Sequence, residues 1–157
     1  MPTVTKPRSA IVAMSAGLAL TVIATVVPFL GSPAGELISK HIKAGYPSYT
    51  ADEVGTATSM YLAWLTIAGV LGVAAWLLSI AAVRAGKRWA PWVATSAFVV
   101  GAGIGLFDLT IRDTSGDTGL PSLIGWLGML PAVAGLVAVV LLWKSRTTRG
   151  ITTRTSS

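Results

Sequence analysis

Cysteine is absent from the 157-residue chain. The protein can therefore form no disulfide, bind no metal ion through thiolates and use no cysteine as a nucleophile. Enzymes that pass electrons through paired thiols are excluded on the same ground. Histidine is nearly absent too, because His41 is the only one, and it lies outside the long apolar stretches where a haem between helices would need its ligand. The sequence predicts no cofactor and no metal ion.

Charged residues are also scarce. They make up 11% of the chain, whereas an ordinary soluble domain carries roughly 25%. Hydrophobic residues reach 53%, and the mean hydropathy is +0.71. Such a chain cannot cover its surface with polar groups in water, so we expect its surroundings to be apolar. The net charge of +6 does not indicate nucleic acid, because the basic residues lie at the ends of apolar stretches rather than along one stripe.

Four long apolar stretches account for this composition. Each has the roughly 17–25 residues needed to cross a hydrocarbon core about 30 Å thick. None alternates polar and apolar residues as a barrel strand does, and backbone groups in lipid must find partners within their own segment. We therefore predict an all-α membrane protein, a bundle of four transmembrane helices. The predicted spans are residues 10–30, 59–83, 89–107 and 120–143.

The basic residues predict which way the bundle faces. Nine of the twelve lysines and arginines lie in residues 1–9, in the link between the second and third spans, or in the tail 144–157. The opposite side holds all six acidic residues and the other three basic ones. Because basic segments stay on the cytoplasmic side, we predict that both termini are cytoplasmic. The polar tail is expected to be disordered and to rest on anionic lipid.

A cleaved signal peptide is an alternative interpretation of the first apolar stretch. Lys6 and Arg8 would be its charged start, and Ser32-Pro33-Ala34 would be a small-residue cleavage site. However, the apolar run is longer than the roughly 7–15 residues of such peptides. We therefore expect the stretch to be retained as a span.

The segment 31–58 is the longest one between predicted spans. It begins with Ser32-Pro33, which combines a capping hydroxyl with a proline at the first helical position. An amphipathic pattern follows, and Gly45 with Tyr46-Pro47 ends it. We predict a short amphipathic helix on the outer face of the membrane, acting as a lid or as a cap.

The end of this segment predicts where the second membrane helix begins. Thr50-Ala51-Asp52-Glu53 has the pattern of a capping box, in which the threonine and the glutamate satisfy each other's backbone N–H groups. The helix is therefore expected to begin near Ala51 and to reach about 50 Å, which is longer than the bilayer core. Asp52 and Glu53 are explained as acids in its first turn.

Small residues at four-residue spacing predict close contact between helices. The simplest interpretation is packing within the bundle, and the alternative is a dimer face on the third span through Gly101 and Gly105. Pro131 lies in the middle of the fourth span and is expected to bend it. The residues predicted to serve helix packing are Gly17, Gly72, Gly101, Gly105, Gly128 and Pro131.

Four polar residues are candidates for a functional site: Asp108, Arg112, His41 and Glu36. Asp108 ends the third span, and Arg112 lies four residues later, so the two form an ion pair if the helix continues. An acid at membrane depth is otherwise a candidate for carrying a proton or for pairing with a substrate. The spacing of His41 and Glu36 matches no metal signature. No residue is predicted to be catalytic.

These patterns favour a small multi-pass protein of the cell membrane that works by contact, as an accessory, assembly or membrane-organising subunit rather than an enzyme. Its expected partners are membrane lipids and either copies of itself or a larger membrane complex. One alternative is an oligomeric transporter or channel with Asp108 at its outer mouth, although no acid lies near the middle of a span. Another is a membrane enzyme that uses Glu36, His41 and Asp52 on the outer face.

Overall fold

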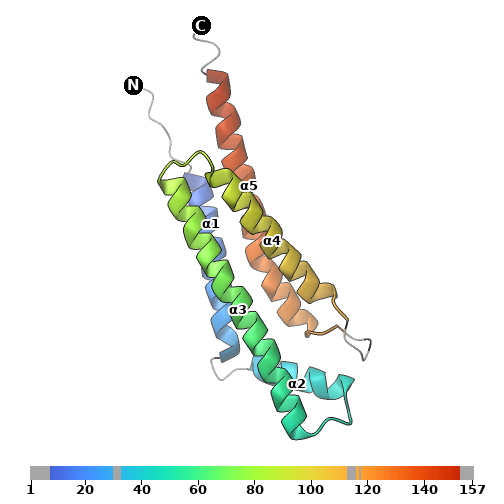
Figure 1. The fold of residues 1–157 in the computed structure, drawn as a ribbon. Coiled ribbons are helices and arrows are strands. Elements are labelled where there is room, and N and C mark those ends of the chain that lie inside the picture. The colour runs from blue at the N-terminus through green and yellow to red at the C-terminus, as the bar shows by residue number, and fades with distance from the viewer. Residues whose placement is uncertain (1–7, 30–32, 113–115, 117, 153–157) are drawn as a thin grey trace.

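The computed structural model describes residues 8–29, 33–112, 116 and 118–152. These residues form five α-helices and one turn of 3₁₀ helix (Figure 1). One isolated β-bridge joins Arg112 to Thr118 between the last two helices. The elements are α1 (Arg8–Val26), η1 (Val27–Phe29), α2 (Pro33–Gly45), α3 (Ala51–Arg84), α4 (Ala90–Thr110) and α5 (Ser122–Thr152).

Four of these helices are long and apolar enough to cross a membrane. They are α1, α3, α4 and the Ser122–Arg146 part of α5. The predicted fold class is therefore confirmed: an all-α protein with four candidate spans and a short helix between the first two. α1 ends at Val26, before the predicted boundary at residue 30, because Pro28 has no backbone N–H to continue the helix.

The last helix is longer than predicted. The tail from residue 144 was expected to be disordered, but α5 continues as far as Thr152. Residues 144–152 contain no proline, and basic residues such as Lys144 and Arg146 stabilise the C-terminal end of a helix because that end of the helix dipole is negative. Residues 1–7 and 153–157, and Ser32 of the predicted helix start, lie outside the described residues.

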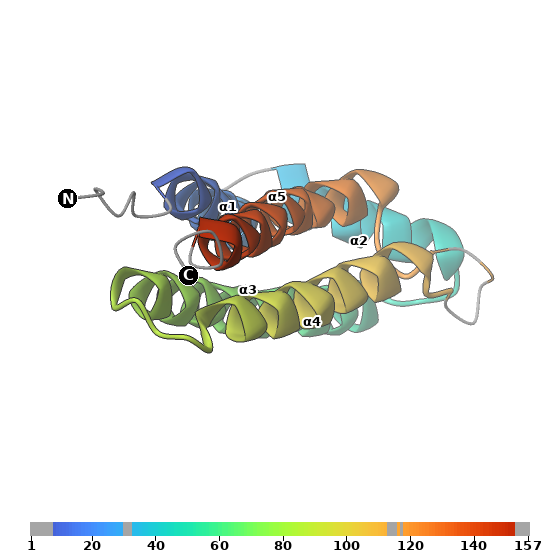
Figure 2. The ribbon, with the colours of Figure 1, turned by 90° about the horizontal axis from the view of Figure 1, so that it is seen from above.

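Seen from above, the four long helices form two layers (Figure 2). α1 and α5 lie in one layer, and α3 and α4 lie in the other. α1 packs against α3 and α5, and α4 packs against the same two helices. The start of α1, the α3–α4 link and the end of α5 lie together at what we name the terminal end, and α2 lies at the opposite end, the α2 end (Figure 1).

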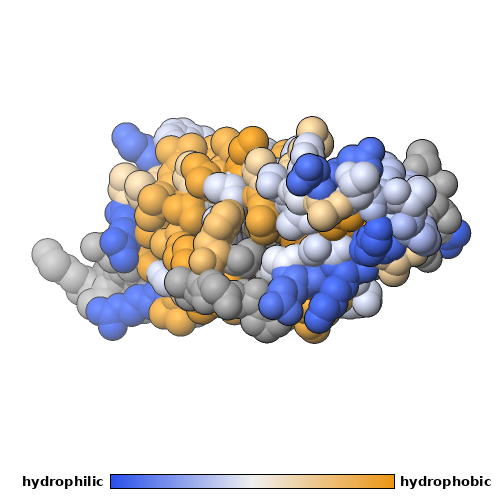
Figure 3. All heavy atoms as spheres, turned by 90° about the horizontal axis from the view of Figure 1, so that it is seen from below, coloured by the Kyte–Doolittle hydropathy of each residue, from blue (hydrophilic) through white to orange (hydrophobic). Residues whose placement is uncertain are grey.

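The sides of the bundle are apolar. Each long helix leaves large hydrophobic side chains in the open, such as Val12, Ile67, Val99 and Val133, which are 57% to 68% exposed. On the face seen in Figure 3, hydrophobic residues form a band between two hydrophilic ends. Exposure of such a band is favourable in hydrocarbon and unfavourable in water.

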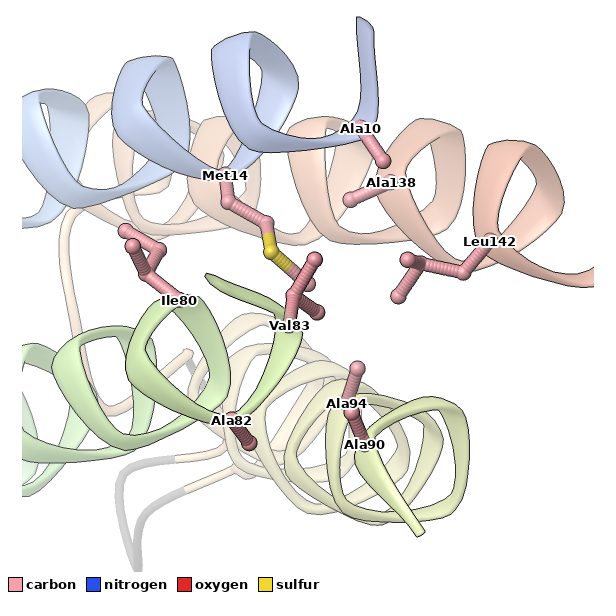
Figure 4. Packing of buried hydrophobic residues seen from close by; sticks show 9 residues of the cluster. All are labelled: Ala10, Met14, Ile80, Ala82, Val83, Ala90, Ala94, Ala138 and Leu142. Atoms are coloured by element: carbon pink, nitrogen blue, oxygen red, sulfur yellow. The ribbon is translucent and has the colours of Figure 1, made fainter. Parts of the chain in front are cut away.

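The largest buried cluster lies near the terminal end and consists mainly of small residues (Figure 4). Met14 of α1 points toward Val83 of α3, and Ala10 lies beside Ala138 of α5. Short side chains let the helix backbones approach closely here. The buried members are Ala10, Met14, Ile80, Ala82, Val83, Ala90, Ala94, Ala138 and Leu142.

The start of α3 confirms the predicted capping box. The Thr50 hydroxyl accepts a hydrogen bond from the Glu53 N–H at 3.3 Å, and the Glu53 carboxylate accepts one from the Thr50 N–H at 2.7 Å. With 34 residues, α3 is about 51 Å long. A hydrocarbon core of about 30 Å, measured from Arg84, ends near Trp64. Residues 51–63 are therefore the part of α3 in excess of one core thickness, and we name them the projecting part of α3.

Candidate functional site

α2 closes one end of the bundle by burying its apolar side on the projecting part of α3. Ile38 and Ile42 of α2 are buried together with Val54 of α3. The periodic pattern of α2 places both isoleucines on one side, so the helix lies across the bundle end (Figure 1). The partly buried residues packed around them are Tyr46, Tyr49, Ala57, Tyr61, Leu62, Leu65 and Ile124.

Lys43 holds the loop that joins α2 to α3. Its Nζ donates a hydrogen bond to the Pro47 carbonyl at 2.9 Å and another to the carbonyl of Tyr49. The rings of Tyr46 and Tyr49 stack with their centroids 4.7 Å apart. The amine of Lys43 is thus engaged in shaping the turn.

His41 connects α2 to the loop between α4 and α5. Its Nε2 donates a hydrogen bond to the carbonyl of Thr118 at 2.5 Å; the carbonyl can only accept, so this nitrogen carries the proton. The loop is held further by Gly119, whose N–H donates to the Ile111 carbonyl at 3.0 Å. A Cβ added to Gly119 would lie 3.2 Å from the hydroxyl oxygen of Tyr61 in α3. His41 therefore fastens one part of the α2 end to another.

The structure pairs Glu36 with Lys40, one turn along α2, at 3.6 Å. Both side chains are largely exposed. Asp52 is exposed in the first turn of α3. Among the described residues, no group of three histidine, aspartate or glutamate side chains could hold a metal ion. The enzyme hypothesis requires Glu36, His41 and Asp52 to act together, but the three residues have different neighbours.

Asp108 pairs with a tryptophan rather than with Arg112. The Nε1–H of Trp64 in α3 donates a hydrogen bond to Asp108 Oδ1 at 2.9 Å. α4 ends at Thr110, and Ile111 is already extended, so Arg112 does not lie one helical turn beyond Asp108. Asp108 lies about 27 Å along α4 from Ala90, a length close to the thickness of a hydrocarbon core of about 30 Å. The pair ties α3 to α4 near the end of α4.

Two more tryptophans make the same kind of contact elsewhere in the bundle. Trp76 of α3 donates from Nε1 to the Thr21 hydroxyl of α1 at 3.0 Å. Trp143 of α5 donates from Nε1 to the Thr95 hydroxyl of α4 at 3.1 Å. Each threonine in turn donates to the carbonyl four residues earlier in its own helix. Each indole N–H thus has a hydrogen-bond acceptor on a neighbouring helix.

These tryptophan contacts were not predicted from the sequence. The signal is present as a hydroxyl in one span and an indole in another, but many such combinations exist in the chain. Only the order of the helices in space selects Thr21 for Trp76 and Thr95 for Trp143.

Gly17 and Gly72 lie at the contact between α1 and α3. A Cβ on Gly17 would lie 2.3 Å from Cζ2 of Trp76, so a glycine is needed where the indole crosses α1. A Cβ on Gly72 would lie 3.1 Å from Cγ2 of Thr21. The two glycines leave room for the hydrogen-bonded Thr21–Trp76 pair.

Gly101 and Gly105 of α4 have different surroundings. A Cβ on Gly105 would lie 2.8 Å from Sδ of Met129 in α5, so Gly105 faces the bundle. Gly101 has no side-chain neighbour within 4 Å of that position, and the same holds for Gly128 of α5. Pro131 lies within α5, whose helix continues past it. The two glycines of the predicted α4 dimer face thus do not share one exposed surface.

One row of small residues has no covering helix among the described residues. Ala51, Gly55, Ser59 and Ala63 recur every four residues along the projecting part of α3, and all are exposed. Together with Asp52, Thr56 and Met60 they line a shallow open hollow, which we name the α3 projecting face.

No family model matches the chain, and searches of curated proteins and of solved structures find no similar protein.

Proposed function

We propose that the protein is a non-enzymatic membrane subunit that works by contact with another membrane protein. The observation that carries this proposal is that indole N–H groups of the long helices form hydrogen bonds between helices. The three indole hydrogen bonds, from Trp64, Trp76 and Trp143, all join one helix of the bundle to another. A transporter needs polar groups that line a path, whereas these groups hold the bundle together.

The α3 projecting face supports the same function. Elsewhere in α1 and α3, small residues accommodate a neighbour's side chain, as Gly17 does for Trp76. Gly55 has nothing within 4 Å of its Cβ position, and Met60 is 68% exposed. Small residues every four positions allow a partner helix to approach the backbone of α3.

Charge indicates what kind of helix would fit the α3 projecting face. Asp52 lies on the face and Glu53 lies next to it. A second copy related by a two-fold axis through this face would place Asp52 against Asp52, which disfavours self-pairing. We therefore propose a partner helix that extends beyond the bilayer and carries a basic residue near the level of Asp52.

The proposal includes an orientation. Every charged residue described at the terminal end is basic, and the described acids lie toward the α2 end. Basic segments favour the cytoplasmic side, which would place the α3 projecting face outside the cytoplasm. The basic residues in question are Arg8, Arg84, Lys87, Arg88, Lys144 and Arg146.

Gentle detergent extraction of the tagged protein from its own membranes, followed by mass spectrometry, tests this function. A leucine at Gly55 would fill the α3 projecting face, and a leucine at Gly101 provides the control, since both positions are exposed and open. We expect a membrane protein to co-purify with the wild type and the Gly101→Leu variant, but not with Gly55→Leu. Co-purification that survives Gly55→Leu, or a wild-type protein extracted alone, would overturn the proposal.

A further inference from the structure

Two tryptophans meet where α4 begins and the Ser122–Arg146 part of α5 ends, and a third, Trp89, is the N-cap residue of α4. The rings of Trp92 and Trp143 lie edge to face, with centroids 5.0 Å apart and planes at 89°. The hydrogen bond from Trp143 to Thr95 fixes the orientation of its indole. Trp92 and Trp89 are 61% and 46% exposed. Indole rings with this partial exposure favour the boundary between hydrocarbon and lipid headgroups.

Arg146 adds a fixed positive charge to these rings. Its guanidinium carbon lies 5.7 Å from the centroid of the Trp143 ring. Its Nη2 donates a hydrogen bond to the backbone carbonyl of Arg88, just before α4, at 2.5 Å. A guanidinium has five N–H donors, and this carbonyl takes one. Arg146 is thus held between α5 and the start of α4 with donors left for a further acceptor.

The charge around Arg146 has no acidic counterpart among the described residues of the terminal end. Lys87 and Arg88 lie directly before α4, whose N-terminus is the positive end of a helix dipole. That position favours acidic side chains, but the first turn of α4 has none. Lys40 and Glu36, which form an ion pair, lie at the α2 end. The start of α4 therefore concentrates positive charge and attracts an anion.

We propose that this basic and aromatic seat, formed by Arg88, Trp89, Trp92, Trp143 and Arg146, binds the headgroup of an anionic phospholipid. A phospholipid brings a phosphate to the level of Arg146 and glycerol and acyl chains to the level of the exposed indoles, so one molecule matches both halves of the seat. Guanidinium groups suit phosphate because their N–H donors match its oxygens. This inference depends on membrane insertion of the chain and not on the proposed contact function.

Lipid retention by the purified full-length protein tests the seat. The protein is placed in nanodiscs of phosphatidylcholine and phosphatidylglycerol, released, and examined by native mass spectrometry for retained lipid. Arg146→Gln removes one charge from the seat, and Arg84→Gln removes one charge from the same end at a residue of α3 outside the seat. We expect Arg146→Gln to lower phosphatidylglycerol retention about fivefold and Arg84→Gln to lower it less than about twofold.

Two outcomes would overturn the seat. One is an equal loss of retention in Arg146→Gln and Arg84→Gln, which would indicate attraction by diffuse charge. The other is a wild-type protein that retains as much phosphatidylcholine as phosphatidylglycerol. A measurement on the wild-type protein tests the proposal even if Arg146→Gln does not fold. Brominated phosphatidylglycerol should quench tryptophan fluorescence more than brominated phosphatidylcholine does at the same mole fraction. Equal quenching by the two lipids would contradict the proposal.

Discussion

The two ends of the bundle are held together by different kinds of contact. Near the terminal end the buried cluster contains Ala10, Ala90 and Ala138, and its helices meet at close range. At the α2 end the buried residues are larger and include Ile38 and Ile42. In hydrocarbon, burying an apolar side chain against protein has little driving force, so packing and hydrogen bonds decide stability. The α2 end contains residues 51–63 of α3, the length in excess of one core thickness, and outside hydrocarbon the hydrophobic effect stabilises such contacts.

This comparison predicts that the largest effect of a single truncation lies in the α2 end. Ile38 is fully buried, so Ile38→Ala should destabilise the docking of α2 by about 2–4 kcal/mol. Hydrogen exchange of the α2 backbone should rise sharply while the four long helices stay protected. Leu37→Ala is the control, because Leu37 is 37% exposed on the same helix. Equal effects of the two variants would break the comparison.

Among the four long helices, we expect stability to be most sensitive to substitutions that add side-chain atoms rather than to those that remove them. Gly17→Ala should destabilise the bundle by about 1–3 kcal/mol, because the new Cβ would lie 2.3 Å from Cζ2 of Trp76. Gly101→Ala is the matched change on an open helix surface and should be neutral or stabilising by up to about 1 kcal/mol. Thermal unfolding in detergent, followed by tryptophan fluorescence, measures both. A harmless Gly17→Ala would contradict the close crossing of α1 and α3.

The hydrogen bonds between helices should contribute less. Trp76→Phe removes the donor to Thr21 and should cost about 0.6–1.7 kcal/mol beyond the loss of ring area. A double-mutant cycle with Thr21→Val separates the bond from the packing change. A coupling energy near zero in that cycle would show that the indole and the hydroxyl do not stabilise each other.

The smallest effect is expected at the boundary between the two regions. Asn can accept the Trp64 hydrogen bond through its own oxygen, so Asp108→Asn should change stability by less than about 0.5 kcal/mol, whereas Asp108→Ala should cost about 1 kcal/mol. The same pair of variants tests the transport alternative. Loss of a solute flux in a stably folded Asp108→Asn protein would replace the contact function with transport.

Much of the fold could be predicted because its causes are local. Continuous apolar stretches predict the four long helices, and the Thr50–Glu53 capping box predicts the start of α3 at Ala51. Gly45 predicts the end of α2. Even the unpredicted end of α1 has a local cause in Pro28, which was included in the predicted span.

The contacts of the candidate site could not be predicted, because they depend on which helices become neighbours. Asp108 was expected to pair with Arg112 along one helix, but α4 ends at Thr110 and Trp64 of α3 supplies the partner. His41 reaches the carbonyl of Thr118, 77 residues away. No spacing in the sequence records such a pairing, since it arises only when the α4–α5 loop meets α2.

Labelling of single cysteines tests the central claim, that the long apolar helices cross a membrane, most directly. The chain contains no native cysteine, so Ser48→Cys, Lys87→Cys and Val99→Cys report on the α2–α3 loop, the α3–α4 link and the exposed side of α4. With a membrane-impermeant maleimide, we expect Ser48→Cys to react in intact cells, Lys87→Cys only after permeabilisation, and Val99→Cys in neither case. Reaction of Ser48→Cys and Lys87→Cys from the same side, or ready labelling of Val99→Cys, would contradict the account.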